Sequence, residues 1–217
     1  MKKRIIVITL ISLLILIFII IYLLYKFNYI PHKMYSNEYF NIKTYTSSID
    51  KDNDGVDDQT DILNNVREYI ATNPKYKSKY YASGYPDDGY GVCTDVVAFG
   101  LKGAGYDLME LVNEDIKNNR NNYNIDTIDK NIDFRRVQNL KIYFENNAIS
   151  LTTDVYDIEN WQGGDIVIFQ NHIGIVSNNR NKDGVTFIIH HANPLQKYYE
   201  EDILESRNDI IGHYRMS

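Results

Sequence analysis

Residues 85–97 read YPDDGYGVCTDVV and contain Cys93, the only cysteine of the chain. Glycine and aspartate precede this cysteine, and a pattern of small and apolar residues follows it. This change from turn residues to helical apolar spacing predicts a helix that begins at or near Cys93. Backbone N–H groups and the positive end of the helix dipole favour negative charge at such a position. We therefore expect the pKa of the thiol to be lowered toward the thiolate form.

The overall composition bounds the class of protein. The chain has 217 residues and a formal net charge of -6, with acidic and basic residues interspersed. This length fits one domain with additional segments. No nucleic acid is expected as a partner, because a basic face is absent from the sequence pattern. A single cysteine excludes an intramolecular disulfide and leaves two readings of Cys93, a buried inert thiol or a nucleophile.

The first 27 residues predict a transmembrane anchor. Basic residues 2–4 precede an apolar run from Ile5 to Leu24, and aromatic residues follow it. A run of about 20 apolar residues spans a bilayer, whereas a signal peptide has a shorter apolar core and ends at small residues. A long cleaved signal is the alternative. The basic N-terminal side predicts a cytoplasmic N-terminus in the cell membrane, with an extracytoplasmic linker over residues 28–49 and an extracytoplasmic domain over residues 50–217.

Residues 50–61, DKDNDGVDDQTD, have the spacing of a calcium-binding loop. Such a loop places oxygen ligands at positions 1, 3, 5, 7, 9 and 12 around one cation, with glycine at position 6. The predicted ligands are Asp50, Asp52, Asp54, Asp58 and Asp61 through their carboxylates and Val56 through its backbone carbonyl. Position 12 is usually Glu, and Asp61 is shorter. We expect a structural Ca²⁺; the alternative is an acidic turn that caps a helix starting near Thr60.

Helical patterns occupy the first part of the domain and strand patterns the last part. Helices are expected from Cys93 to Gly103, over residues 108–116 and over residues 141–148. Strands are expected over residues 166–169, 172–177, 185–191 and 210–215, the first as an apolar run buried on both faces. This order predicts an α+β domain in which helices pack on an antiparallel meander.

Two histidines occupy strand ends that a hairpin brings together. His172 begins one expected strand and His190 lies near the end of the next. A cysteine nucleophile needs a base to take its proton, and the base needs a third group that fixes its orientation. The pattern therefore predicts a Cys–His–polar site of Cys93, His172 and His190. A zinc site is the competing chemistry, but close ligand pairs of the HExxH or CxxC kind do not occur.

Five ordered motifs make the chain resemble the DUF1287 family of bacterial proteins. They are GVCTDVV at 91–97, NIDFRRV at 131–137, WQGGDIV at 161–167, HIGIVS at 172–177 and GHYR at 212–215. That family in turn resembles the NlpC/P60 and CHAP groups of papain-like cysteine peptidases and amidases. The resemblance covers residues 50–217 and implies a papain-like fold, with Cys93 as nucleophile, His172 as base and His190 as the orienting residue. His191 replaces an Asn of the family pattern, so the pair His190-His191 leaves open which ring faces the site.

Five further residues are candidates for substrate contact. Arg135 and Arg136 can bind a substrate carboxylate, or else form an internal ion pair with Asp133. Asp95 lies in the first turn of the expected helix, where it caps the helix or accepts a hydrogen bond from a substrate amine. Tyr90 can donate to an oxyanion. His191 is the remaining candidate in this group.

The function implied by the resemblance is cleavage of an amide bond. We expect a membrane-anchored, extracytoplasmic cysteine peptidase or amidase that acts on peptidoglycan stem peptides through an acyl-enzyme and uses no cofactor for catalysis. Two alternatives remain open. The first is a binding module of the same fold that holds cell-wall peptide or a protein without cleaving it. The second is an acyl transferase that passes the acyl group to an amine instead of water.

Overall fold

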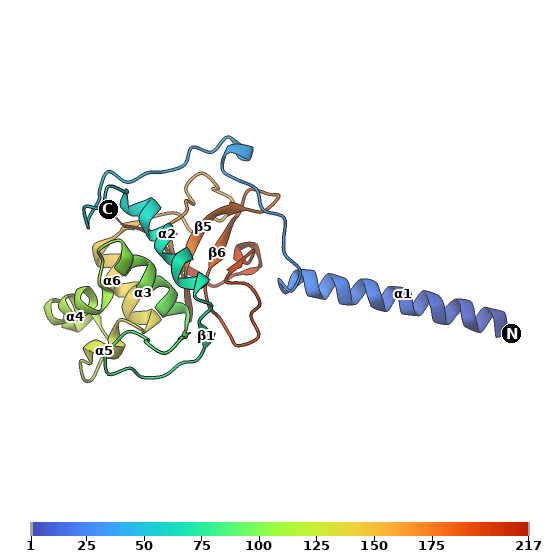
Figure 1. Ribbon diagram of the computed structural model, residues 1–217, viewed down its shortest axis with the longest axis horizontal. Helices are drawn as coiled ribbons and strands as arrows, with labels where there is room; N and C mark the ends of the chain where they lie inside the picture. Colours follow the sequence, from blue (N-terminus) through green and yellow to red (C-terminus); the bar gives the residue numbers. More distant parts are fainter. Residues whose placement is uncertain (1, 217) are drawn as a thin grey trace.

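A mixed helix-and-sheet domain with one long projecting helix is seen in the computed structural model, which describes residues 2–216 (Figure 1). The helices are α1 (Lys2–Lys26), α2 (Asp58–Ala71), α3 (Cys93–Gly103), α4 (Leu108–Asn118), α5 (Lys130–Asp133) and α6 (Val137–Asn147). The strands are β1 (Lys75–Tyr76), β2 (Tyr90–Gly91), β3 (Ile149–Ser150), β4 (Ile166–Phe169), β5 (His172–Arg180), β6 (Thr186–Ile189), β7 (Glu200–Glu201) and β8 (Ile210–Arg215). The predicted α+β class is confirmed.

Within residues 2–216, six strands form one antiparallel sheet in the order β3-β8-β4-β5-β6-β7. Strands β4, β5 and β6 form a meander, as expected, and β7, which was not predicted, extends it. The last strand, β8, does not extend this meander, because it returns to pair with β4 on one side and β3 on the other. A separate parallel pair, β1 with β2, aligns Tyr76 with Gly91 and so fixes the chain just before Cys93.

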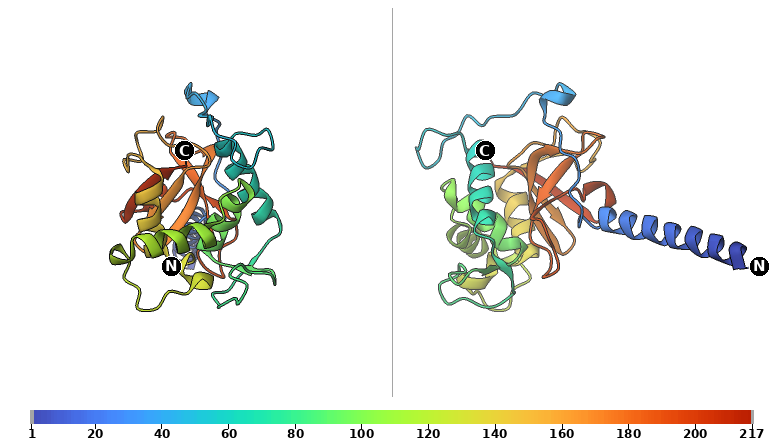
Figure 2. Two further views of the ribbon diagram at one scale, coloured as in Figure 1. Left: turned by 90° about the vertical axis from the view of Figure 1, so that its left-hand side faces the viewer. Right: turned by 45° about the vertical axis from the view of Figure 1, so that its right-hand side comes forward.

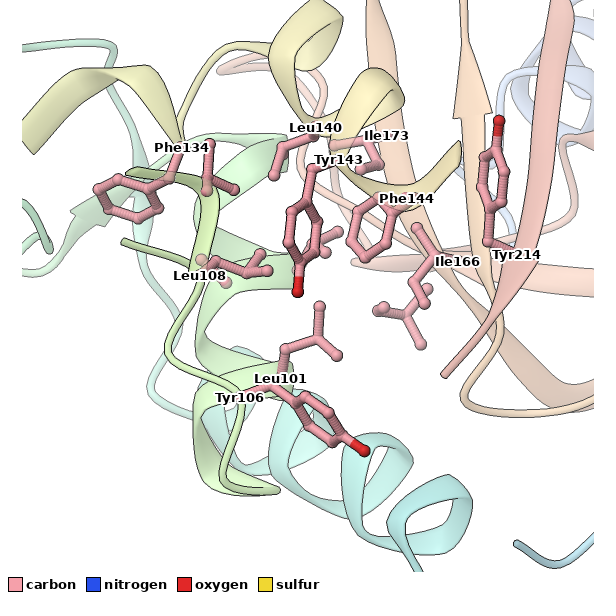
Figure 3. Packing of buried hydrophobic residues seen from close by; sticks show 14 of the residues in the cluster. Leu101, Tyr106, Leu108, Phe134, Leu140, Tyr143, Phe144, Ile166, Ile173 and Tyr214 are labelled. Carbon is pink, nitrogen blue, oxygen red and sulfur yellow. The ribbon is translucent and has the colours of Figure 1, made fainter. Parts of the chain in front are cut away.

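Strand β4 is buried on both faces, as its apolar run predicts. Ile166 and Ile168 belong to the larger apolar cluster, which includes residues of the helices. Val167 and Phe169 belong to a smaller cluster on the other face, together with Trp161. Figure 3 shows the larger cluster between the helices and the sheet, with side chains from α3, α4, α6, β4, β5 and β8. The sheet is therefore the central layer of the domain.

Helix α3 packs between α2 and the sheet. It crosses α2 at Gly100, where an added Cβ would lie 3.0 Å from Cβ of Val66 and 3.4 Å from the carbonyl oxygen of Ile62. A residue with a side chain would push the two helices apart. On its other side α3 contacts β5. These contacts bring the beginning of α3, at Cys93, near the beginning of β5, at His172.

Helix α1 projects away from the domain on the side of β6 (Figures 1 and 2). It has 25 residues and none of them is buried. At about 1.5 Å per residue it is longer than the ~30 Å hydrocarbon core of a bilayer. Its length and composition are therefore sufficient to cross a membrane, a property that N-terminal signal sequences share.

The linker after α1 lies against the domain for part of its length. Asn28, Asn37 and Ile42 are buried. Tyr35 exchanges two backbone hydrogen bonds with Arg180, of 2.9 and 2.8 Å. The fully buried Arg180 also donates from Nε to Oδ1 of Asn37 at 2.5 Å. Residues 28–49 are thus held at several points on the sheet side of the domain.

Candidate active site

Cys93 is the first residue of α3, as the sequence predicts. Val92 before it is extended, with φ -136° and ψ -176°, and its backbone N–H donates to Oδ2 of Asp95 at 2.8 Å. This hydrogen bond closes the first turn of the helix by satisfying a backbone donor that the helix leaves free. The backbone N–H groups of Cys93, Thr94 and Ile173 all lie close enough to the sulfur to stabilise its charged form. Ile173 follows His172 directly, so the thiol lies at the start of β5.

The electrostatic environment of Cys93 differs from the expectation. Burial raises the pKa of the Cys93 thiol to about 11, and the backbone N–H groups offset only part of this rise. The helix start alone had predicted a lowered pKa, and that prediction is wrong. Removal of the sulfur from water disfavours the thiolate more than the helix start favours it. A thiolate at Cys93 therefore requires a nearby group that takes its proton.

His172 and His190 lie in direct contact. Nε2 of His172 is 2.9 Å from Nδ1 of His190, and the two rings are perpendicular, with an interplanar angle of 84°. This contact uses Nε2 of His172 and leaves its Nδ1 outside the pair. The sequence prediction that a hairpin brings these two histidines together is therefore matched by the geometry, with His190 one residue beyond β6.

Gly174 makes this approach of the two histidines possible. In the β5–β6 register Ile175 pairs with Ile189, which places His190 opposite Gly174. An added Cβ at Gly174 would lie 2.5 Å from Cγ2 of Ile188, 2.9 Å from the carbonyl oxygen of Ile189 and 3.2 Å from Cβ of His190. The glycine of the His-x-Gly motif thus leaves room for the second histidine.

Both rings are held in the neutral form. Burial, and the repulsion between the two rings, keep the pKa of His172 below its ordinary value of 6.5. The pKa of His190 is also lowered, by burial and by the nearby positive charge of Arg207. A neutral imidazole can accept a proton, so His172 is able to act as a base at neutral pH.

Glu201, a residue that the sequence analysis did not select, lies on the far side of His190. Its Oε2 is 3.2 Å from Nε2 of His190, although the direction of this contact is outside hydrogen-bond geometry. Burial raises the pKa of Glu201 to about 7. His172, His190 and Glu201 therefore follow one another in space, and the Cys93 sulfur lies near the backbone N–H of Ile173, the residue after His172. Strand β7, which carries Glu201, is two residues long, so its sequence has no alternating pattern that would have revealed it.

His191 faces a different environment from His190. Its ring packs edge-on against Tyr76, at 5.2 Å between centroids, and against Tyr199, at 5.0 Å. Its Nδ1 is buried and has no hydrogen-bond partner among the described residues. His190 is thus the member of the pair that contacts His172. Through Tyr76, His191 lies beside the β1–β2 pair that leads to Cys93.

Two of the predicted substrate contacts are corrected by the structure. Arg135 and Asp95 form an internal ion pair, with Nε to Oδ1 at 2.6 Å and Nη2 to Oδ2 at 2.9 Å. Their side chains are 2% and 0% exposed. Each group uses its hydrogen-bonding capacity inside the protein, so neither is available to a substrate. Arg135 forms an internal ion pair as its alternative role requires, but with Asp95 instead of Asp133, and Asp95 is the helix cap.

Arg136 and Tyr90 remain accessible. The side chain of Arg136 is 54% exposed and lies 3.6 Å from Asp133. It lines a surface depression of about 800 Å³ with Gln138 and Gln170. Tyr90 is half-buried in β2, and the ammonium of Lys77 lies 5.2 Å from its ring centroid. Tyr90 lies three residues before Cys93 in the chain, whereas Arg136 belongs to a depression for which Cys93 is not a lining residue.

The predicted calcium loop is only partly assembled as expected. Ligand atoms of Asp50, Asp52 and Asp54 lie within 4.8 Å of one another. Gly55, at loop position 6, has φ +94°, a left-handed conformation that glycine adopts readily. Backbone N–H groups of residues 54 and 55 donate to the carboxylate of Asp50 at 3.1 and 2.9 Å. This part of the loop thus gathers three of the six predicted ligands around one point, where a calcium ion takes six to eight oxygens.

The remaining predicted ligands have other partners. Asp58 accepts hydrogen bonds from the hydroxyl of Tyr106 and from the backbone N–H of Lys51, so its predicted place in the cluster is corrected. Asp61 accepts from Asn65 at 2.7 Å. Helix α2 begins at Asp58, and Asp57 caps it by accepting from the N–H of Thr60 at 3.3 Å. The loop therefore also contains the helix cap that was its alternative interpretation.

The remaining family motifs meet in one buried polar cluster. Asp165 is fully buried and accepts from Nε and Nη2 of Arg215, each at 2.7 Å. Nε2 of His213 lies 3.1 Å from the same carboxylate, and the ring of Trp161 stacks on His213 at 3.8 Å. These residues join β4, β8 and the turn before β4. Their positions explain the WQGGD and GHYR motifs as structural elements.

Comparisons with known proteins place these motifs in a family. The model described as "Domain of unknown function (DUF1287)" matches residues 63–216. The chain is also 34% identical over 167 residues to a protein of Escherichia coli (strain K12) described as "Uncharacterized protein YijF", with 71% of this chain and 80% of the relative covered. No solved structure matches the chain. The matched range begins inside α2 and includes Cys93, His172, His190 and Glu201, but not the acidic loop or α1. The chain therefore belongs to the DUF1287 family.

Proposed function

We propose that this protein is a cysteine peptidase or amidase that is anchored in a membrane and acts on amide bonds of peptidoglycan stem peptides. One observation carries the proposal. Cys93 begins α3 and its sulfur lies close to the backbone N–H of Ile173, while the preceding residue, His172, contacts Nδ1 of His190 through its Nε2 at 2.9 Å. A nucleophile, a base and a group that orients the base are the parts that acyl transfer through a thiol requires.

The first half of the proposed reaction forms an acyl-enzyme. Nδ1 of His172 takes the proton of the Cys93 thiol while the sulfur attacks the carbonyl carbon of the substrate amide. Because both groups are neutral at rest, proton transfer accompanies the attack. The backbone N–H groups of Cys93 and Thr94 are the donors nearest the sulfur on α3, and they stabilise the negative oxygen that forms. His172 then returns the proton to the leaving amine, and the C–N bond breaks.

The second half releases the product. Water replaces the amine at the site, and His172 takes one of its protons as the oxygen attacks the thioester. The tetrahedral intermediate collapses, the C–S bond breaks, and the proton returns to the Cys93 sulfur. His190 holds the ring of His172 in place in both halves through the Nε2 contact. An amine in place of water would give the transferase reaction instead of hydrolysis.

The proposed fold and location support the same function. A helix that begins with the nucleophile and packs on an antiparallel sheet that carries the base is the arrangement that a papain-like, NlpC/P60-like domain requires. Helix α1 is apolar enough to span a membrane, and basic residues precede its apolar part. By the distribution of positive charge the domain lies outside the cell membrane, where peptidoglycan is the abundant source of peptide bonds.

The test is amine release from purified peptidoglycan. The full chain in detergent micelles is incubated with peptidoglycan, and new amino groups and soluble peptides are measured by labelling and mass spectrometry. Cys93→Ala should lower turnover by at least about 1,000-fold, since removal of a nucleophile abolishes the acyl-enzyme route. The melting temperature of Cys93→Ala serves as the control for folding.

Three outcomes separate the proposal from its alternatives. Amine release that survives in Cys93→Ala would rule out the thiol mechanism. Saturable binding of cell-wall peptide without any release, in the wild-type protein and the variant alike, would identify a binding module. Products in which an added amine is joined to the peptide would identify an acyl transferase.

A further inference from the structure

Glu201 faces the last polar atom of the histidine pair. Strand β7 pairs with β6 in a register that aligns Ile188 with Glu201. His190, just beyond β6, is held by a hydrogen bond from its backbone N–H to the carbonyl oxygen of Tyr199 at 2.8 Å. Oε2 of Glu201 lies 3.2 Å from Nε2 of His190, and both side chains are buried. In unliganded active sites contacts of this kind are often poorly aligned and tighten on substrate binding.

The short distance between the two histidines couples their protons. With 2.9 Å between Nε2 of His172 and Nδ1 of His190, one of these nitrogens carries hydrogen and the other accepts it. For His172 to be a base through Nδ1, its hydrogen must be on Nε2. Nδ1 of His190 must then be the acceptor, and the hydrogen of His190 must be on Nε2. Oε2 of Glu201 lies 3.2 Å from this nitrogen, and we expect the N–H to align on that oxygen when substrate binds.

We propose that Glu201 is a positioning residue that fixes the hydrogen of His190 on Nε2, and through His190 fixes the hydrogen of His172 on Nε2. This leaves Nδ1 of His172 free to accept the proton of Cys93. The inference rests on the proposed function, since it assigns a role within the same site. Glu201 itself touches neither the thiol nor the substrate in this arrangement.

We call the series Glu201, His190 and His172 the relay. Protonation of Glu201 reverses the positions of the two histidine hydrogens in it. A protonated carboxyl donates to Nε2 of His190, which moves the hydrogen of His190 to Nδ1. Nδ1 of His190 then donates to Nε2 of His172, and the hydrogen of His172 moves to Nδ1, where it blocks acceptance of a proton from Cys93. The relay is therefore active with the carboxylate and inactive with the carboxylic acid. Burial raises the pKa of Glu201 to about 7, which brings this change into the neutral range.

Solvent can reach the carboxyl group. His190 and Glu201 line a surface cavity of about 710 Å³, together with residues 26–29 of the anchor and linker. The titratable and charged groups that face the relay come from the linker, from β5, from the segment after β6 and from the segment before β8. They are His32, His172, His190, His191, Arg207 and Asp209. Burial keeps His172, His190 and His191 neutral well below pH 6.5, so their titration is separated from that of Glu201.

The direct test measures where the hydrogens lie. Full-length protein labelled with ¹⁵N in its histidines is studied in detergent micelles by long-range ¹H–¹⁵N correlation, which distinguishes Nδ1–H from Nε2–H rings. At pH 8 the wild-type protein should show Nε2–H for both His172 and His190. Glu201→Leu should lose this preference at His190. Retention of the wild-type pattern in Glu201→Leu would overturn the proposal, whatever the result of any activity assay.

Activity gives the second readout. Glu201→Gln keeps an oxygen that accepts from Nε2–H but cannot be protonated, so it should retain most activity and lose the fall in kcat below about pH 7 that the wild-type protein should show. Glu201→Leu should lower kcat by about 10- to 100-fold with little change in KM, the range found for residues that orient a catalytic group indirectly. An unaltered acidic fall of kcat in Glu201→Gln would contradict the assignment.

The neighbouring residue provides the control. Glu200 lies on the same short strand and pairs with Arg67 at 3.3 Å and Asn179 at 2.7 Å, away from His190. Glu200→Gln should change neither the histidine tautomers nor the pH profile. If no substrate is turned over by the wild-type protein, the proposed function fails while the tautomer experiment still decides the role of Glu201.

Discussion

Arg135 binds both carboxylate oxygens of Asp95, the residue that closes the first turn of the Cys93 helix. Nη1 of Arg135 also donates to the carbonyl oxygen of Lys79 at 2.7 Å. The guanidinium therefore ties the start of α3 to the loop after β1. A planar group with several donors is required for this geometry, which an ammonium cannot reproduce. The position of Cys93 at the start of α3 thus depends on the Asp95–Arg135 ion pair.

Asp95→Asn should destabilise the domain strongly. It leaves Arg135 as a buried charge without a counter-charge, which costs about 3–5 kcal/mol of unfolding free energy. Denaturant unfolding of the full chain in micelles measures this change. Arg136→Gln is the matched control, because the side chain of Arg136 is 54% exposed and its loss should change stability by no more than about 0.5 kcal/mol. Equal effects of the two substitutions would show that the buried pair has no special role.

The rate of Cys93 alkylation should show whether the reactivity of the thiol depends on His172. Burial raises the pKa of the thiol to about 11, so without a base its thiolate fraction at pH 7 is on the order of 10⁻⁴, against roughly 10⁻² for a free cysteine. Iodoacetamide should therefore label His172→Ala far more slowly than the wild-type protein at pH 7. Because Cys93 is the only cysteine, the mass of the intact chain measures the reaction directly.

The same experiment has an internal control. At pH values near the pKa of the thiol the labelling rates of the wild-type protein and His172→Ala should converge, since the thiolate then forms without a base. His213→Gln, which removes a histidine of the Asp165 cluster, should leave the rate at pH 7 unchanged. If the wild-type protein is labelled no faster than His172→Ala at pH 7, His172 does not take the proton of the Cys93 thiol.

Local sequence patterns predicted the elements that carry Cys93 and the two histidines. The change from turn residues to helical spacing located the start of α3, and the apolar run 166–169 located β4. The hairpin between β5 and β6 follows from the chain order of two strand patterns. In each case the information lies within about ten residues, which is the range over which periodicity can be recognised.

The relationships that the sequence analysis missed are all long-range. Strand β8 pairs with β4 rather than with β6, and its composition does not encode this choice of partner. Asp58 matches a calcium ligand by its position in the loop. Its carboxylate instead accepts a hydrogen bond from the hydroxyl of Tyr106, which lies 48 residues further along the chain. Glu201 lies on a strand of two residues, and its closeness to His190 arises only when β7 pairs with β6. Burial of the Cys93 sulfur depends in the same way on elements that pack from elsewhere in the chain.

Calcium should stabilise the domain if the loop of residues 50–55 binds it. Asp50, Asp52 and Asp54 lie within 4.8 Å of one another, and a bound cation would neutralise their repulsion. A concentration of Ca²⁺ 100 times the dissociation constant adds about 2.7 kcal/mol, which corresponds to a rise of roughly 5–10 °C in melting temperature. Calorimetry with and without chelator measures this rise. Asp52→Asn should make the rise in melting temperature smaller. If the melting temperature changes with neither Ca²⁺ nor chelator, the loop is a helix-capping turn without a calcium site.

Stability should fall in acid because of the buried histidines. Burial lowers the pKa of His172 and His190 below 6.5, so between that value and their folded-state pKa the unfolded chain binds more protons than the folded one. Unfolding free energy therefore rises with pH in this window, by about 1.4 kcal/mol per pH unit for each such histidine. Glu201 has the opposite sign, because its raised pKa makes the folded state bind the extra proton between about pH 4.5 and 7.

Two single variants separate these opposing contributions. His190→Gln should reduce the slope of unfolding free energy against pH by up to about 1.4 kcal/mol per pH unit, the value for one proton. Denaturant titration from pH 5 to 6.5 measures this slope. Glu201→Gln should increase the same slope, since it removes the group that takes up a proton on folding in that range. Because His190 and Glu201 are in contact, the double variant should depart from the sum of the two changes. Slopes that are unaffected by either substitution would mean that neither group changes its proton affinity on folding.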